Sequence, residues 1–319
     1  MTARDGHRVL VTGATGFVGR ALLPRLLAAG YRVRAALRRP EAVLPAGVEA
    51  VTVADLGATP DWRPALEDVR FVVHLAARVH VMGKTGPEAL ALYHEINALG
   101  THRLAQAARA AGVERVLLLS SVKAMGEGGP TPLTETTPPA PADAYGRSKL
   151  AAESLLREAA QDAMAWVVLR PPLVYGPGVG ANFLRLLRLA RSGLPLPLAA
   201  IDNRRSLVFV DNLADAITHC LTHPGAADRC FLIHDGQPLS LPELIRRLSH
   251  ALGRPARLFP LPAMLLRLAG EEAYQRLCGS LVVDDTALRT ATGWKPVATI
   301  DDGLAATAAW ARQGDLAKG

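Results

Sequence analysis

The chain has 319 residues, half of them hydrophobic, and a formal net charge of +7. No segment approaches the ~20 consecutive apolar residues that span a bilayer, so no membrane span is expected. The basic residues are scattered rather than interleaved with aromatics, which argues against a nucleic-acid partner, although a positive field would attract a polyanionic small substrate.

The first predicted elements form a βαβ unit. They are a β-branched strand at residues 8–12, a turn containing Gly13, Gly16 and Gly19, an apolar helix at 20–29 and a second strand at 31–37. Glycines in such a turn allow a tight bend and let backbone N–H groups approach a diphosphate at the helix N-terminus. This placement predicts a dinucleotide-binding turn.

The alternation of strands and helices continues as far as Arg170. Strands are predicted at 48–55, 71–77, 115–121 and 166–170, and helices at 62–67, 88–111 and 145–162. This order implies an α/β fold with a parallel, doubly wound sheet, whose ligands lie at the carboxyl ends of the strands. We place a dinucleotide-binding domain at residues 1–172.

The character of the chain changes after Arg170. Loop-rich sequence leads to a predicted helix at 182–192, a strand at 205–210, a helix from Asn212, a strand near 231–234 and a helix at 241–252. Residues 173–319 are predicted to form a smaller C-terminal substrate-binding lobe, of which about 205–235 returns to the sheet.

The cysteines and the N-terminus indicate a cytoplasmic protein. Cys220, Cys230 and Cys278 fit neither a metal-ligand spacing nor a disulfide framework, so we expect no metal site and a reducing environment. Met1 to His7 is polar and runs straight into a strand, so no signal peptide is predicted.

A tyrosine stands four residues ahead of a lysine near the start of one predicted helix. These positions share a helix face, so Tyr145 and Lys149 would point into one cleft. A phenol with a pKa of about 10 is a poor acid–base catalyst at neutral pH, and a nearby ammonium would stabilise its phenolate. The spacing is common on surface helices and indicates catalysis only together with the glycine turn and the sheet.

Several further motifs occur in an order typical of one family. They are Thr12-Gly13-x-x-Gly16-x-x-Gly19, Asp55-Leu56, His74-Leu75-Ala76-Ala77, Asn97 with Gly100-Thr101, Ser120-Ser121, Tyr145-x-x-x-Lys149, and Arg170-Pro171 with Tyr175-Gly176-Pro177. From Val9 to about Val210 the chain resembles the extended short-chain dehydrogenase/reductases, which include nucleotide-sugar epimerases, dehydratases and reductases. The resemblance implies a Rossmann fold and a nicotinamide dinucleotide cofactor.

The resemblance also implies which residues would bind that cofactor. They are Gly13, Thr15, Gly16, Phe17, Val18 and Gly19 at the diphosphate, Asp55 and Leu56 beside the adenine, Leu75, Ala76 and Ala77 along the adenosine and nicotinamide, and Pro172, Tyr145 and Lys149. Asn97 is either a further cofactor-side residue or a helix cap.

Three residues would perform the chemistry in this family pattern. Tyr145 would exchange a proton with the substrate oxygen, and Lys149 would hold the ribose hydroxyls and depress the tyrosine pKa. Ser121 would hydrogen-bond the reacting oxygen, with Ser120 as the competing candidate for that role.

The end of the second strand bears on the choice of cofactor. NAD enzymes usually carry an acidic residue there, whereas this chain has Arg38 and Arg39. Arginine suits a 2′-phosphate, so NADP(H) is favoured, with Arg38 the better candidate and NAD(H) the alternative. Either arginine could instead be a solvated loop charge.

The substrate lobe resembles that of UDP-sugar enzymes. By that resemblance Asn182 and Arg205 would contact a diphosphate, although a capping Asn182 and a structural Arg205 remain open. Val122-Lys123 replaces the acidic pair that follows the serine in dehydratases, so dehydration is not expected, and Lys123 becomes a candidate substrate residue. The pattern looks closest to reductases of bacterial surface-polysaccharide (O-antigen) pathways, which reduce a UDP-linked 4-keto-6-deoxy-N-acetyl sugar.

Three functions follow from these features. The first is NADPH-dependent reduction of a C4 ketone, with Tyr145 protonating the oxyanion. The second is a UDP-sugar 4-epimerase that keeps NAD bound, and the third is a non-catalytic dinucleotide sensor on the same fold. Helices that correspond to 88–111 and 145–162 form a dimer interface in many members of the family. The resemblance therefore implies that this protein could be a homodimer.

Overall fold

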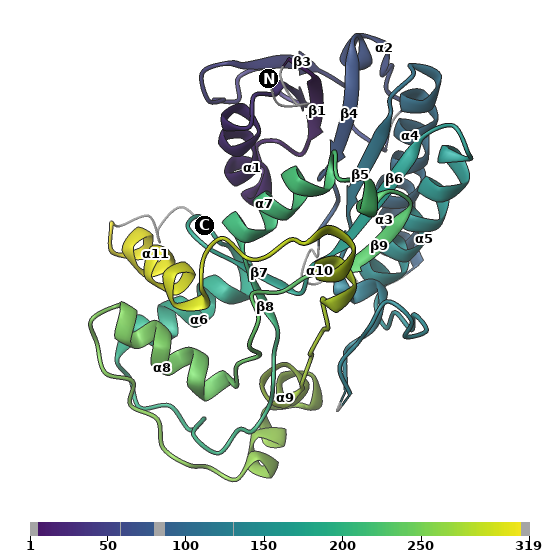
Figure 1. The fold of residues 1–319 in the computed structure, drawn as a ribbon. Helices are drawn as coiled ribbons and strands as arrows, with labels where there is room; N and C mark the ends of the chain where they lie inside the picture. Colours follow the sequence, from purple (N-terminus) through teal and green to yellow (C-terminus); the bar gives the residue numbers. More distant parts are fainter. Residues whose placement is uncertain (1–5, 58, 80–86, 130, 314–319) are drawn as a thin grey trace.

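The computed structural model describes residues 6–57, 59–79, 87–129 and 131–313 (Figure 1). Its main feature is a parallel sheet of seven strands in the order β3-β2-β1-β4-β5-β6-β9. The strands are β1 (Arg8–Thr12), β2 (Arg32–Leu37), β3 (Val48–Thr52), β4 (Val69–His74), β5 (Arg115–Leu119), β6 (Ala165–Arg170) and β9 (Arg229–Leu232). The predicted α/β, doubly wound Rossmann architecture is therefore confirmed.

Helices cover both faces of this sheet and create two separate cores. On one face, α1 (Phe17–Ala28), α7 (Val210–Cys220) and α10 (Thr286–Thr292) pack on side chains such as Val9 and Val11. On the other face, α2 (Arg63–Leu66), α4 (Gly100–Ala110) and α5 (Ala144–Ala160) pack on side chains such as Leu10 and Val72. Successive residues of a strand thus enter different cores, which explains why the central strands are apolar throughout.

The predicted helix at 88–111 is interrupted in its middle. It begins as α3 (Pro87–Tyr93), continues as the π-helix η1 (His94–Leu99) and ends as α4. A π-helical turn contains an additional residue, so it rotates the side chains that precede it relative to those that follow. The helix is therefore not one regular cylinder beside the candidate site.

The second half of the chain builds a smaller lobe and also extends the main sheet. In the lobe, β7 (Leu173–Tyr175) pairs in parallel with β8 (Leu207–Phe209), and helices α6 (Ala181–Ser192), α8 (Leu241–Ala251) and α11 (Ile300–Arg312) share a core. The strand predicted at 205–210 is thus part of the small sheet, whereas α7 and β9 return to the large one (Figure 1). The division at residue 172 stays a prediction.

A buried polar junction joins the lobe to the large sheet. The Asp235 carboxylate, just beyond β9, accepts hydrogen bonds from the Tyr175 hydroxyl at 2.8 Å, the Asn212 amide at 2.7 Å and the Phe209 backbone N–H at 2.7 Å. The other side of the Asn212 amide pairs with the backbone of Ala298. These bonds come from four separate segments, so they set how the lobe is oriented on the sheet.

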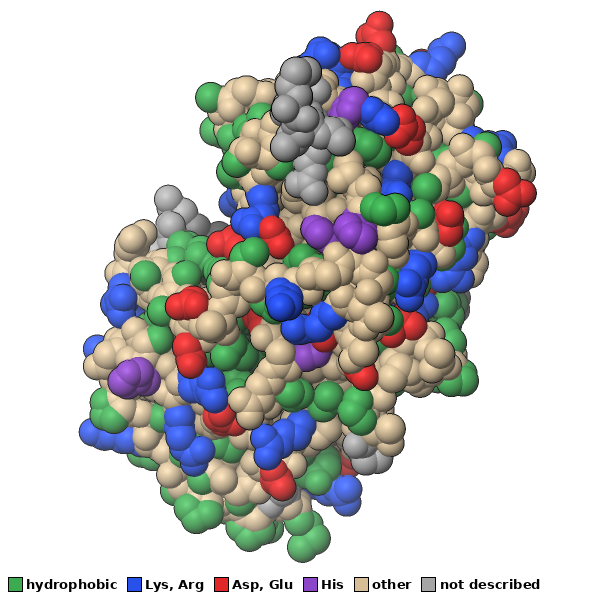
Figure 2. Space-filling model, in the orientation of Figure 1, with side chains coloured by type: hydrophobic (Ala, Val, Ile, Leu, Met, Phe, Trp, Pro, Cys, Tyr) green, Lys and Arg blue, Asp and Glu red, His purple; other side chains and the backbone are tan. Residues whose placement is uncertain are grey.

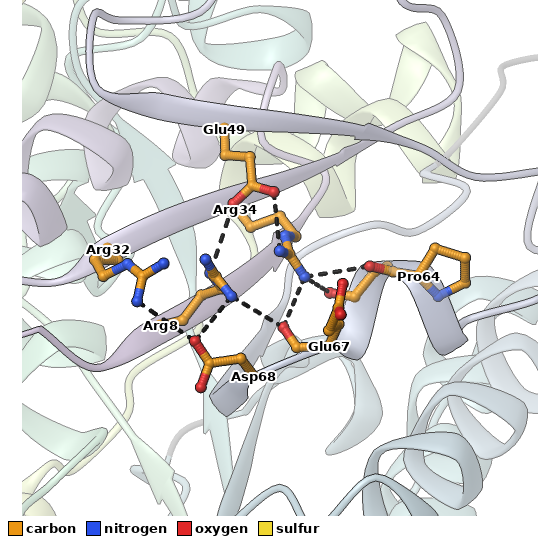
Figure 3. A network of polar contacts seen from close by, with 8 residues as sticks. Arg8, Arg32, Arg34, Glu49, Pro64, Glu67 and Asp68 are labelled. Atoms are coloured by element: carbon orange, nitrogen blue, oxygen red, sulfur yellow. Dashed lines mark hydrogen bonds and ion pairs between the residues drawn. The ribbon is translucent and has the colours of Figure 1, made fainter.

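An arginine-rich network anchors the amino ends of the first strands (Figure 3). Buried Arg34 donates to three carbonyls at the end of α2 and pairs with Glu49 at 2.9 Å. Arg8 pairs with Asp68 at 3.0 Å. The hydrogen bond from Arg34 lowers the pKa of the Glu49 carboxyl. This end of the sheet is thereby closed by structural charges, and the opposite, carboxyl end is left for ligands.

Candidate functional site

The glycine turn lies at the carboxyl end of β1. Gly13 has a φ of +68°, and a Cβ there would lie 2.7 Å from the backbone nitrogen of Ala76. A Cβ at Gly19 would collide with the carbonyl oxygens of residues 13 and 14. Helix α1 begins after Gly16 without a side-chain cap, so no side chain of its own satisfies its first amides. This cradle fits a dinucleotide diphosphate.

A buried polar chain supports the turn from below. The Thr12 hydroxyl accepts from the Ala76 N–H at 3.2 Å and lies 2.6 Å from His74 Nδ1, while Nε2 lies 3.0 Å from the Thr101 hydroxyl. Burial lowers the pKa of His74 to about 3, so its ring is neutral at ordinary pH. Because Thr101 donates to the Asn97 carbonyl, it accepts from Nε2–H, which leaves Nδ1 of the neutral ring to accept from the Thr12 hydroxyl.

The side chain of Asn97 serves the protein's own structure. From η1 it accepts from the Arg78 N–H at 2.7 Å, and it donates to the Arg78 carbonyl at 3.0 Å and to the Ser148 hydroxyl at 2.9 Å. Both amide hydrogens are thus used within the protein. The alternative of a helix cap is wrong, because Asn97 lies inside η1. A place on the cofactor side stays a prediction, with the amide hydrogens already used within the protein.

The three candidate catalytic side chains come together at the carboxyl end of β5. Ser121 precedes the 3₁₀ helix η2 (Val122–Ala124), and its hydroxyl lies close enough to the Tyr145 phenol to lower the pKa of that phenol. The Lys149 ammonium lies 5.9 Å from the centre of the Tyr145 ring and donates to the Leu119 carbonyl at 2.8 Å. The spacing of the two residues thus brings their side chains near each other, and their role as a catalytic pair stays a prediction.

Local sequence positions this part of the site. Asp143 caps helix α5, accepting from the Gly146 N–H at 2.6 Å. A Cβ at Gly146 would collide with the carbonyl oxygen of Lys123, so only glycine lets α5 approach η2 this closely. As a result Tyr145, in the first turn of α5, can reach Ser121.

The electrostatics of Tyr145 differ from the prediction. Burial of the phenol raises its pKa to about 12, although the residue as a whole is partly exposed, and the Ser121 hydroxyl opposes this only in part. Burial lowers the pKa of Lys149 to about 8, against the pull of Glu153. Lys149 does not depress the tyrosine pKa here because its ammonium is directed at the Leu119 carbonyl, not at the phenol oxygen.

A buried ion pair lies behind Lys149. Arg170 binds the Glu153 carboxylate through two nitrogens, at 2.9 Å and 2.5 Å, and the Ser120 hydroxyl donates to the same carboxylate at 2.5 Å. All three side chains are buried. Ser120 thus points away from Tyr145, which favours Ser121 over its neighbour as the serine of the site.

The proposed adenosine end contains an ion pair that the sequence did not reveal. Arg38, just after β2, donates to Asp55 at 2.9 Å, with both side chains well exposed. The Gly57 N–H and Arg38 together lower the pKa of Asp55. Arg39 is exposed beside them. An exposed pair of this kind contributes at most about 1 kcal/mol, so a ligand phosphate could compete for Arg38.

The remaining predicted cofactor residues surround the turn in different ways. Leu75, Ala76 and Ala77 follow β4 and are partly exposed, and Thr15 is exposed within the turn. Leu56 and Pro172 are buried, and Phe17 and Val18 pack against the core of the small lobe rather than lining open space. All of these residues can therefore offer their backbone to a cofactor, but only some of them can offer a side chain.

The predicted substrate residues are less clearly gathered. Lys123 pairs with Glu127 at 2.5 Å and lies 3.7 Å from Asp143, while Asn182 is exposed in the first turn of α6. Arg205 donates to carbonyls at the end of α9 (Glu271–Cys278), which agrees with its structural alternative.

Tyr93 is a further residue beside the candidate site, and nothing in the sequence marks it. Its ring meets Tyr145 edge-on at 6.3 Å, and its hydroxyl donates to the Val79 carbonyl at 3.3 Å. Neither an alternating nor a helical pattern marks such a residue, because the π-helix that follows it decides which way it faces.

Two classes of structure are absent from the described ranges. Within them no cluster of three or more His, Cys, Asp or Glu side chains could hold a metal ion. Likewise no helix there is long and apolar enough to cross a membrane.

Comparisons with known proteins agree with this site. Residues 9–232 match the model of the NAD dependent epimerase/dehydratase family. A UDP-glucose 4-epimerase of Vibrio cholerae is 41% identical over 94% of each chain, and a 2-alkyl-3-oxoalkanoate reductase of Stenotrophomonas maltophilia is 30% identical over 93% of this chain and 97% of its own. The solved structure of MoeE5 with UDP-glucuronic acid and NAD has a TM-score of 0.76 at 28% identity, covering 96% of this chain and 99% of that one.

Proposed function

The chain belongs to the NAD-dependent epimerase/dehydratase family, and we propose that it interconverts the C4 epimers of a UDP-linked hexose. The observation that carries the proposal is the meeting of Ser121, Tyr145 and Lys149 beside the glycine turn. The similarity to a UDP-glucose 4-epimerase over nearly the whole chain supports it.

The residues divide the work of such a reaction. The backbone at Gly13 and Gly16 and the α1 N-terminus would hold the diphosphate of the cofactor, whose nicotinamide accepts and returns the hydride of C4. Tyr145 would take the proton from the C4 hydroxyl and later return it, and Ser121 would hold the same oxygen in place. Tyr145 is neutral in the structure, so forming the phenolate that takes this proton would require the Lys149 ammonium to turn from the Leu119 carbonyl to the phenol oxygen. With a pKa of about 8, Lys149 is largely charged at neutral pH and would then stabilise that phenolate.

Reduction of a C4 ketone is the second candidate. Two observations favour it: the protonated state that burial imposes on Tyr145, which suits a proton donor, and the basic end of β2 at Arg38 and Arg39. Its substrate would be a UDP-4-keto-6-deoxy-hexose, with or without an N-acetyl group. The similarity to a reductase along most of the chain is consistent with this reading.

The cofactor preference depends on Arg38. For the reductase candidate, we propose that a 2′-phosphate would replace Asp55 as the partner of Arg38, which would favour NADP(H). The epimerase candidate would instead keep NAD and leave the pair of Arg38 and Asp55 intact. Asp55→Asn removes the competing charge, so NADPH binding should tighten about threefold to tenfold while NADH binding changes little. Titrations of both nucleotides by intrinsic fluorescence measure this, and equal changes for the two would contradict the role of Arg38.

Purification followed by assay separates the two activities. We expect the protein to convert UDP-glucose into UDP-galactose without added nucleotide, a conversion that proton NMR detects. We also expect it to release NAD when it is denatured. Activity only on UDP-4-keto-6-deoxy sugars with consumption of NADPH would establish the reductase instead.

A variant tests the chemistry in either case. Tyr145→Phe should lower kcat by about 10²–10⁴ while the Kd of the nucleotide stays within about threefold. Unchanged turnover in that variant would show that Tyr145 is not the proton carrier.

A further inference from the structure

The small lobe exposes large apolar side chains on two adjacent segments. Leu194 lies on the first, and Phe259, Met264, Leu265 and Leu268 lie on the second, which includes the 3₁₀ helix η4 (Ala263–Ala269). Met264 is 74% exposed and Leu268 87%. Figure 2 shows hydrophobic side chains at the lower end of this lobe, with basic and some acidic side chains near them.

The exposure is a property of a folded surface. The two segments are joined by a parallel bridge between Leu196 and Leu258, with hydrogen bonds of 2.8 Å and 3.0 Å on its two sides. On η4, Leu266 packs against the small core formed by Leu196, Leu198 and neighbours. With three residues per turn, Leu265 and Leu268 share a face that Leu266 does not. One side of η4 is therefore anchored while the apolar side chains of another side remain in water.

The two segments that carry this patch are basic. Residues 252–270 contain Arg254, Arg257 and Arg267 and no acidic residue, and residues 181–201 contain three more arginines and again no acid. Arg254 and Arg257 are exposed, and Arg254 reaches across to the Arg191 carbonyl at 3.2 Å. Acidic residues border these stretches at Asp202, Glu271 and Glu272, and Glu271 pairs with Arg267 at 3.8 Å, so Arg254 and Arg257 carry the positive charge of the patch.

We propose that this patch docks the protein on the surface of a membrane that contains anionic lipids. Exposed leucine, methionine and phenylalanine surrounded by arginine match the requirements of an interfacial segment, since apolar side chains enter the headgroup boundary while cations meet lipid phosphates. A soluble partner protein would need matching apolar and acidic surfaces, whereas an anionic bilayer offers both over its whole area. No residue of the patch belongs to the Tyr145 site.

Vesicle flotation with the full chain tests this proposal. The protein should float with phosphatidylcholine vesicles that contain phosphatidylglycerol, and only weakly with phosphatidylcholine alone. Leu265→Glu/Leu268→Glu and, separately, Arg254→Gln/Arg257→Gln should each weaken binding about tenfold or more, and added salt should weaken it further. The matched controls are Val43→Glu, 96% exposed in the other half of the molecule, and Arg63→Gln, which should bind like the parent.

Several outcomes would overturn it. They are absence of binding to anionic vesicles, equal binding to neutral ones, or equal losses in the control variants. Light scattering distinguishes one alternative. If the parent is a dimer, the Leu265→Glu/Leu268→Glu variant is a monomer and neither binds vesicles, the patch is an interface between two copies of the chain. Turnover of a soluble substrate should stay unchanged in the patch variants, which shows that they are folded.

Discussion

Replacing Lys149 by methionine should change how stability depends on pH, because the ammonium is buried. Burial lowers the pKa of Lys149 to about 8 from an ordinary value of 10.5. Between these two values the unfolded chain binds a proton that the folded chain has released, so the contribution of Lys149 to the free energy of unfolding rises with pH. Below pH 8 the buried charge costs the fold roughly 3 kcal/mol, and above pH 10.5 this cost disappears.

The size of the effect over an accessible range follows from these values. From pH 7.5 to pH 9.5, Lys149 should add about 2 kcal/mol to the free energy of unfolding. Two thiols have the opposite effect, since burial raises the pKa of Cys220 and of Cys230 to about 12. In this pH range they lose their protons only in the unfolded chain, so together they lower the free energy of unfolding by a similar amount. The parent protein should therefore stay nearly constant in stability, whereas Lys149→Met should lose about 2 kcal/mol over the same range.

Urea unfolding measures this difference. Protein stripped of nucleotide is unfolded under reducing conditions at several pH values in this range, followed by the fluorescence of its four tryptophans. Lys295→Met is the matched control, because Lys295 is exposed and its removal should leave the pH profile unchanged. If the Lys149→Met profile runs parallel to that of the parent, the ammonium is not desolvated in the way its surroundings indicate.

Three further substitutions test other parts of the structure. Gly13→Ala should weaken nucleotide binding at least about tenfold, because the added Cβ would meet the backbone after β4. The control is Gly112→Ala, which has a similar φ but open space and should cost only about 1 kcal/mol of stability. Equal effects of the two variants on nucleotide affinity would contradict this prediction. Glu153→Gln should lower the free energy of unfolding by about 3–5 kcal/mol, since Arg170 would lose its buried counter-charge, and urea titration would expose any smaller change. Arg34→Met should cost about 2–3 kcal/mol in the same measurement without altering nucleotide affinity, as it lies at the opposite end of the sheet.

The sheet and the proximity of Tyr145 and Lys149 could be predicted because local pattern determines them. Parallel strands buried on both faces must be apolar throughout, and a glycine turn between such a strand and a helix has few other uses. The positions of Tyr145 and Lys149 on one helix follow from the helical repeat alone. These features depend on neighbours within a few residues of the chain.

The side-chain partners could not be predicted because they are distant in sequence. Arg205 binds carbonyls some seventy residues away, and Asn97 binds Ser148 across two elements. The direction of the Tyr145 pKa depends on burial by several segments and on where the Lys149 ammonium points. The π-helix likewise has no marker in the hydrophobic pattern, since its neighbours α3 and α4 read as one continuous helix.

The position of β9 at the edge of the sheet has a consequence for how the protein is made. Strand β6 is complete by Arg170, but its outer edge is covered only when Arg229–Leu232 has been synthesised. During translation the six earlier strands therefore wait with an open edge while about sixty more residues leave the ribosome, an interval in which such an edge can pair with another chain. A fragment ending near residue 172 would retain that open edge permanently, so we expect it to aggregate rather than persist as a separate domain.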